Sequence, residues 1–162
     1  VLDNREIRAF KDTGTGLIEV PALNVFLNDI DNPVQITTMG EDLVVLDSKG
    51  SLYYYRFQNT FYEKDPALSI VGSNLAIDST DGSLLSINQI NDINTFQYTG
   101  SSLAKNEYLS FAHDGAISVT GIENDYTVFV RDENGITSYV YDGTKMVPKQ
   151  MINQLPIKYL GK

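Results

Sequence analysis

His113 is the only histidine in this chain, and cysteine is absent. Serine–histidine and cysteine–histidine catalysis, thiolate metal sites and histidine-rich metal sites therefore cannot be built from this chain alone. His113 lies in a short polar turn that ends in Gly115, so we expect a solvated imidazole that faces out of this turn. These residues favour a protein that is not an enzyme and that uses no cofactor.

Aspartates in turns are the next residues that could bind an ion. Asp29 and Asp31 lie beside Asn32, and Asp78 lies near Asp81. Calcium takes about six to eight oxygen ligands, which such side chains can supply. The full Asp-x-Asp-x-Asp-Gly pattern is missing, however. Because Asp and Asn side chains also accept hydrogen bonds from nearby backbone N–H groups, ordinary turn formation is the preferred interpretation and no metal site is predicted.

Paired carboxylates could also hydrolyse a glycosidic bond. That chemistry needs two groups at a defined separation across a cleft, and a sequence does not specify this distance. Among 21 Asp and Glu residues, chance pairs are expected. The phosphate-binding patterns GxxxxGK(S/T) and GxGxxG are absent, so nucleotide chemistry has no support.

Three consecutive tyrosines, Tyr53, Tyr54 and Tyr55, are the candidate binding residues. In a strand, Tyr54 would point to the opposite face from its two neighbours. One face is expected to belong to the core, and the other could present aromatic rings for sugar stacking or for a protein partner. Tyrosines also simply fill pleated surfaces, and this is the simpler interpretation.

Charge is unevenly distributed along the chain. The formal net charge is −9, yet residues 143–162 carry four lysines and no carboxylate, so residues 1–142 hold 8 basic and 21 acidic side chains, a net charge of −13. An acidic body repels phosphate backbones, which argues against nucleic-acid binding. No run of about 18 apolar residues is present, which argues against a membrane span.

The basic end is interpreted as a tail, so the chain is divided into a repetitive body (1–148) and a basic carboxyl-terminal tail (149–162). A closing strand with a frayed end is the simpler interpretation of this segment. The alternative is a docking arm for a neighbouring subunit. The candidate docking residues are Lys145, Lys149, Ile157, Lys158, Tyr159 and Leu160.

The elements that must position these residues are short strands. Turn signals every 6 to 12 residues separate sixteen runs rich in Val, Ile, Leu, Tyr, Phe and Thr. Connections this short require antiparallel neighbours, because a parallel crossover needs about a dozen residues or more. No segment has a sustained helical period, and only residues 151–160 tolerate a helix.

A repeat is suggested by three similar segments, 42–52, 74–84 and 107–117. Each has an apolar run, a polar turn that ends in glycine, and a return run, which is typical of a β-hairpin whose glycine has φ > 0. The three glycines lie 32 and 33 residues apart, at Gly50, Gly82 and Gly115. Four strands per repeat predict an all-β, β-propeller-like antiparallel array of about four small blades. A β-sandwich is the alternative, but it gives no reason for the period.

Residues 34–55 (VQITTMGEDLVVLDSKGSLYYY) and 67–87 (ALSIVGSNLAIDSTDGSLLSI) resemble the repeats of RCC1-type β-propellers. Both have an apolar strand that ends in glycine, a second apolar strand, a polar turn with glycine and a third strand. The histidine at the start of the second strand and the Trp-Gly end of the third are missing here. The resemblance therefore implies propeller architecture and no exchange-factor activity.

Together these features favour a non-enzymatic structural or protein-interaction domain. It would be a subunit of a larger assembly, such as a virion or tail component, with a protein partner or a second copy of itself. A lectin-like module that binds a glycan is the alternative, and a carboxylate-based glycoside hydrolase is the least favoured.

Overall fold

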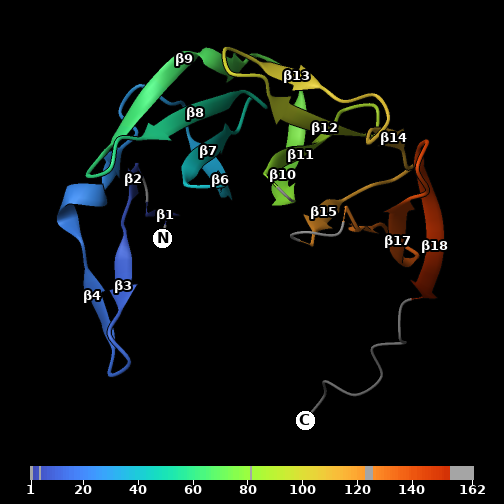
Figure 1. Ribbon diagram of the computed structural model, residues 1–162, viewed down its shortest axis with the longest axis horizontal. Coiled ribbons are helices and arrows are strands. Elements are labelled where there is room, and N and C mark those ends of the chain that lie inside the picture. Colours follow the sequence, from blue (N-terminus) through green and yellow to red (C-terminus); the bar gives the residue numbers. More distant parts are fainter. Residues whose placement is uncertain (1, 4, 81, 123–125, 154–162) are drawn as a thin grey trace. The chain divides into compact units, whose positions relative to one another are not determined.

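The computed structural model describes residues 2–3, 5–80, 82–122 and 126–153. These residues form eighteen strands and one short 3-10 helix, η1 (Pro21–Leu23), with no α-helix among them (Figure 1). Every strand pairing whose register is defined is antiparallel. The predicted all-β antiparallel fold is confirmed, because apolar runs separated by short turns pair mostly with the strands that precede and follow them. The same residues include no helix with the length and apolar character needed to cross a membrane.

Three sheets are each built from successive segments of the chain. The first contains β6 (Pro33–Met39), β7 (Asp42–Asp47), β8 (Leu52–Phe57) and β9 (Tyr62–Ile70). The second contains β10 (Asn74–Thr80), β11 (Ser83–Asn88), β12 (Asp92–Tyr98), β13 (Leu103–Lys105) and β14 (Phe111–Ala112). The third contains β15 (Ser118–Gly121), β16 (Val128–Arg131), β17 (Gly135–Tyr141) and β18 (Met146–Asn153).

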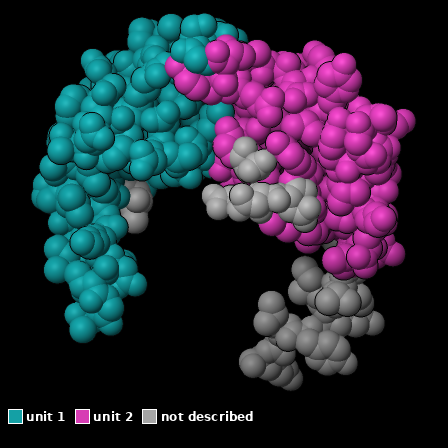
Figure 2. Space-filling view, viewed as in Figure 1, with its two compact units in different colours: residues 1–74, 100–102 teal, residues 75–99, 103–162 magenta. Residues whose placement is uncertain are grey.

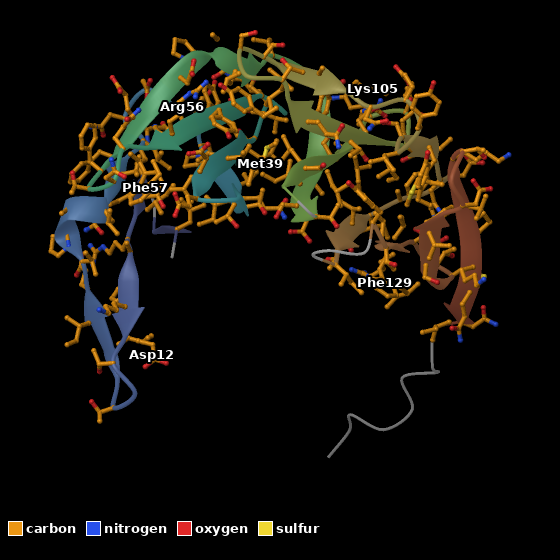
Figure 3. All side chains as sticks on the ribbon, viewed as in Figure 1. Asp12, Met39, Arg56, Phe57, Lys105 and Phe129 are labelled. Carbon is orange, nitrogen blue, oxygen red and sulfur yellow. The ribbon has the colours of Figure 1, made fainter. Side chains whose placement is uncertain are left out.

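A smaller sheet precedes these three. It contains β1 (Leu2–Asp3), β2 (Glu6–Ile7) and β5 (Val25–Phe26). A separate hairpin of β3 (Phe10–Asp12) and β4 (Leu17–Glu19) is inserted between β2 and β5. Figure 3 labels Asp12 on this hairpin. Four sheets in succession agree with the predicted number of about four blades.

The chain divides into two compact units, shown in teal and magenta in Figure 2. Unit 1 comprises residues 1–74 and 100–102, and unit 2 comprises residues 75–99 and 103–162. The core of unit 1 is formed by Ile7, Val25, Leu27, Ile30, Leu43, Val45 and Tyr55. The core of unit 2 is formed by Leu85, Ile87, Ile93, Leu109, Ala116, Val119, Val128, Val130 and Met146.

The three glycines that suggested the repeat have positive φ, as predicted, at +84° for Gly50, +69° for Gly82 and +73° for Gly115. They nevertheless lie in different turns: between β7 and β8, between β10 and β11, and between β14 and β15. The predicted period of 32 to 33 residues is therefore wrong. A tight turn anywhere in a sheet favours glycine, so glycine marks turns without marking equivalent positions.

The period seen in the structure is longer. The first strands of the three sheets begin at residues 33, 74 and 118, so the sheets recur every 41 and 44 residues. The turn from the second to the third strand begins at Asp47, Asn88 or Asp132, and in each case the side-chain Oδ1 accepts two backbone N–H bonds of 2.7 to 3.0 Å. This shared turn is the feature that repeats.

The predicted boundary between the repetitive body (1–148) and the basic tail (149–162) is not a structural boundary. Residues 149–153 belong to β18, which pairs with β17 along Gly135–Tyr141, so the predicted boundary after residue 148 falls inside a strand. Lys145 and Lys149 are both exposed. Ile157, Lys158, Tyr159 and Leu160 lie outside the described residues, and the docking role of all six stays a prediction.

Candidate functional site

The three consecutive tyrosines of β8 differ in accessibility. Tyr54 and Tyr55 are only 2% and 4% exposed, and the Tyr54 hydroxyl donates to Asp42 Oδ2 at 2.6 Å. Tyr53 is half-buried: its hydroxyl donates to Asp47 Oδ2 at 3.1 Å, and Lys64 Nζ lies 4.4 Å from its ring centroid. Both faces of this strand are covered, so Tyr54 and Tyr55 are inaccessible to a ligand and only Tyr53 keeps surface.

The acidic turn at residues 29–32 is engaged in ion pairs. Asp29 pairs with Lys64 at 2.6 Å, and Asp31 pairs with Lys49. The hydrogen bond from each lysine lowers the pKa of its partner carboxyl group. Within the described ranges, no three His, Asp or Glu side chains come together as a metal site.

His113 is not the solvated turn residue that we expected from the sequence. Its side chain is only 9% exposed and lies between Asp132 and Tyr139, with Nε2 3.0 Å from Asp132 Oδ2 and Nδ1 2.7 Å from the Tyr139 hydroxyl. A neutral imidazole satisfies both bonds if Nε2–H donates to the carboxylate and Nδ1 accepts from the hydroxyl. The bond from His113 lowers the pKa of Asp132, and burial raises the pKa of Tyr139.

The candidate site lies where the outer strand of the second sheet is interrupted. β13 and β14 both pair with β12, and residues 106–110 leave the sheet between them; we call this segment the edge loop. Thr95 of β12 anchors the loop, because its N–H donates to Ser110 Oγ, its hydroxyl donates to the Leu109 carbonyl and its carbonyl accepts from Asn106 N–H. Interruptions of this kind redirect side chains at the edge of a sheet.

Asn106 shapes the edge loop from within. Its Oδ1 accepts bonds from the backbone N–H groups of Tyr108 and Leu109 at 3.0 and 3.3 Å, and its Nδ2 donates to Gln97 Oε1 at 2.9 Å. As a result Leu109 points into the core, at 7% exposed, while Tyr108 points out, at 68% exposed.

On one side of the loop, two adjoining hollows of about 430 and 180 Å³ share Gln97, Asn106 and Tyr108; together they are called the tyrosine pocket. Tyr126 and Tyr141 line the smaller hollow, with ring centroids 6.5 Å apart at 63°. The remaining lining residues are Thr99, Ala104, Lys105, Glu107 and Leu109.

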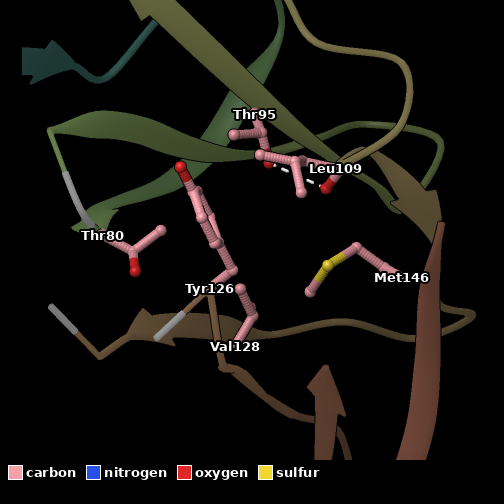
Figure 4. Close-up of a pocket in the computed structure, with 6 residues that line it drawn as sticks. All are labelled: Thr80, Thr95, Leu109, Tyr126, Val128 and Met146. Carbon is pink, nitrogen blue, oxygen red and sulfur yellow. Dashed lines mark hydrogen bonds between the residues drawn. The ribbon is translucent and has the colours of Figure 1, made fainter. Parts of the chain in front are cut away.

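Leu109 and Tyr126 also line a second, very small gap that adjoins the tyrosine pocket. Figure 4 shows Tyr126 and Leu109, which line the pocket, beside Val128 and Met146 of the core. The space among these residues, Thr80 and Thr95 is too small to hold a water molecule. Tyr126 has φ +39°, a backbone conformation that non-glycine residues rarely adopt and that tends to occur at functional positions.

A smaller hollow of about 140 Å³ lies next to the tyrosine pocket and shares Lys105 and Glu107 with it; we call it the Asn94 pocket. Successive side chains of a strand point to opposite faces of the sheet. Along β12, Asp92 and Asn94 therefore point to one face, and Thr95 and Gln97 point to the other. The edge between the two pockets carries Lys105, labelled in Figure 3, whose Nζ lies 3.2 Å from Glu107 Oε2. The Asn94 pocket is lined by Asp92, Asn94, Lys105, Glu107, Ser110, Phe111 and Ala112.

The sequence did not single out any residue of these two pockets. Segment 107–117 was interpreted as a repeated hairpin, and the structure instead places an edge loop, a short strand and a turn there. Tyr108, Tyr126 and Tyr141 are spaced 18 and 15 residues apart and come from three different elements, so no local pattern connects them. The one available signal was Asn106, a side chain that commonly starts a turn.

No family model matches this chain, and no curated protein matches its sequence. Similar solved structures define the class of fold instead, which is β-propeller-like. The predicted propeller architecture is therefore confirmed, whereas the RCC1-type resemblance has no support from a family model.

One similar structure is the SapL1 lectin in complex with α-methyl fucoside, with a TM-score of 0.61 and 15% identity over 94% of this chain. Another is the N-terminal domain of Nup159, with a TM-score of 0.51 and 11% identity over 82% of this chain. A third is a chain of the S. cerevisiae complex of Dbp5 with Nup159 and Gle1, with a TM-score of 0.55 and 10% identity over 83%. This chain spans 57%, 33% and 39% of their respective lengths.

Proposed function

We propose that this chain is a non-enzymatic binding module that binds a carbohydrate in the tyrosine pocket. The observation that carries this proposal is the grouping of three tyrosine rings with two amide side chains around one open hollow. Aromatic rings provide apolar surface for the C–H faces of a sugar. The amide of Gln97, whose Oε1 accepts one bond from Asn106 Nδ2, offers further donors and an acceptor for hydroxyl groups. A few polar groups that converge beside aromatic surface are typical of ligand sites.

The SapL1 lectin, which has a similar fold and holds α-methyl fucoside, supports the proposal at the level of the fold. The sequence favoured a protein-interaction domain and gave a lectin-like module as the alternative. Here the lectin-like module is preferred. The position of the tyrosines is the reason for the change. Those on β8 are mostly covered, while those around the edge loop share a pocket.

No hydrolytic step is placed in this pocket. Glu107 is the one carboxylate among the residues that line it, and it pairs with Lys105. Glycoside hydrolysis commonly uses two carboxylates on either side of the scissile bond, one of them as a general acid. The pocket therefore supports recognition of a sugar without turnover.

Replacing Tyr108 with alanine should weaken glycan binding by about tenfold or more, because an exposed aromatic side chain that contacts a ligand dominates such a site. The measurement is calorimetric titration with α-methyl fucoside first, followed by the strongest ligands from a glycan array. Because Tyr108 is 68% exposed, the variant should unfold at the same temperature as the parent protein.

Phe61→Ala is the matched control, since Phe61 is an exposed aromatic residue (50%) that lies outside the tyrosine pocket. It should bind as the parent protein does. Equal binding by Tyr108→Ala and Gln97→Ala to every glycan that the parent protein binds would contradict the proposed site. No glycan binding by the parent protein would contradict the proposed function.

A protein partner is the second candidate, and the β3–β4 hairpin favours it. Phe10, Leu17 and Ile18 are 42%, 70% and 61% exposed on this hairpin. A two-stranded hairpin is at best marginally stable alone in water, and exposed apolar patches mark interaction sites. The similar chain in the Dbp5–Nup159–Gle1 complex belongs to a protein assembly. We propose a second copy of this chain as the partner.

Exchanging Leu17 and Ile18 for lysine should weaken self-association about tenfold or more, because two apolar contacts would be replaced by charges. Sedimentation of the full chain over a range of concentrations measures this. Val71→Lys, which changes another exposed apolar residue (92%), should leave association unchanged. A parent chain that stays monomeric at all concentrations would rule out this partner.

A further inference from the structure

The Asn94 pocket has a different chemistry from the tyrosine pocket, and we propose that it binds a guanidinium group, such as an arginine side chain of a partner protein. Two features of its lining lead to this assignment: an amide without a hydrogen-bond partner and a carboxylate without a salt-bridge partner among the described residues. The inference does not rest on the proposed glycan function, because Asp92 and Asn94 take no part in the tyrosine pocket; the two pockets share only Lys105 and Glu107.

The amide of Asn94 has no partner. Asn94 is 8% exposed and lines the pocket, yet its side chain makes no hydrogen bond to any residue that the structure describes. The amide atoms of Asn94 keep accessible surface in this hollow, so a ligand can reach them. A bound group that offers N–H donors to Oδ1 would satisfy this side chain.

Asp92 supplies the charge. One of its carboxylate oxygens accepts a 3.3 Å bond from Asn88 Nδ2, and among the described residues no lysine or arginine forms a salt bridge with it. Lys105 lines the same pocket but pairs with Glu107. The two carboxylates and one ammonium leave the pocket with one negative charge, in a chain whose net charge is −9. Such a field attracts cations.

Asp92 and Asn94 favour a flat cation, because a carboxylate and an amide oxygen line the same small hollow. The Phe111 ring packs on Tyr139 against the core, on the face of its paired residue Ile93, so it is not counted as part of the site. A guanidinium group is planar and directs several N–H donors at carboxylate and amide oxygens, whereas an ammonium group is a compact point charge. The volume of about 140 Å³ suits such a head group. A neutral sugar could use the amide, but it would leave Asp92 without a counter-charge.

The test is an NMR titration of the full chain that follows the side-chain amide signal of Asn94. The probes are N-acetyl-arginine methylamide, its citrulline analogue, which is uncharged and of similar shape, and a short peptide with one central arginine. We expect both arginine probes to shift the Asn94 signal, the peptide more tightly if a protein is the natural source, and the citrulline analogue to bind at least about tenfold more weakly.

The Asp92→Asn variant should weaken arginine binding about tenfold, and binding to the parent protein should fall as salt is added, because the contact is charged. Asp114→Asn makes the same charge change at an exposed carboxylate outside the pocket and should have no effect. If Asp92→Asn is unstable, Asn94→Ala and the salt series test the same point. Equal binding of arginine and citrulline, or no shift with any arginine probe, would overturn the proposal. A shift with a neutral sugar alone would assign the pocket to glycan binding instead.

Discussion

Replacing Gly50 with alanine should lower the free energy of unfolding by about 3 kcal/mol or more, whereas Gly82→Ala should cost about 1 kcal/mol. Both glycines have positive φ, +84° and +69°, so both variants carry the same kind of backbone strain. The two positions differ in the room that they leave for a Cβ atom. A Cβ atom on Gly50 would lie 2.6 Å from Asn74 N and 2.7 Å from the Gly72 carbonyl oxygen, while a Cβ on Gly82 would have no atom within 4 Å.

The atoms around Gly50 cannot easily move. Asn74 donates both its backbone N–H and its Nδ2–H to the Gly50 carbonyl, at 3.1 and 2.8 Å, so the turn after β7 is held against the start of β10. Overpacking against backbone is costly because no side-chain rotation relieves it. Chemical denaturation of the two variants measures the difference. Equal losses of stability would show that Gly50 is limited by its φ alone.

The second large effect is expected at His113. His113→Ala should lower the free energy of unfolding by about 2 to 3 kcal/mol, because it removes a buried ring and leaves the Tyr139 hydroxyl without its partner. The loss should be visible in thermal and chemical denaturation at neutral pH. Asp114→Ala, in the same turn but exposed, should change stability by no more than about 0.5 kcal/mol.

Tyr139→Phe separates the two bonds of His113. It removes only the hydroxyl that contacts Nδ1 and keeps the bond from Nε2 to Asp132, so it should cost about 1 kcal/mol. If His113→Ala were as mild as Asp114→Ala, the imidazole would be a solvated turn residue after all, as its position in the sequence suggested.

Much of the architecture could be predicted because it depends on neighbouring residues. Alternating apolar runs and short polar turns specify antiparallel strands, and the positive φ of Gly50, Gly82 and Gly115 follows from the tight turns that contain them. The repeat length could not be read from the same glycines, since each sits in a different turn of its sheet. The turns that begin at Asp47, Asn88 and Asp132 carry the true period, but Asp and Asn are common in turns throughout the chain.

By itself, then, the sequence determined the all-β class, the antiparallel order and the absence of thiol chemistry, because composition and local spacing are sufficient for these properties. Only the tertiary structure decided which polar and aromatic groups meet. His113 forms hydrogen bonds with Asp132 and Tyr139, which follow it in the sequence by 19 and 26 residues. Tyr108 lines the same pocket as Tyr126 and Tyr141. Packing within each unit makes such contacts and also places Tyr55 in the core of unit 1, and no pattern within a single strand encodes it.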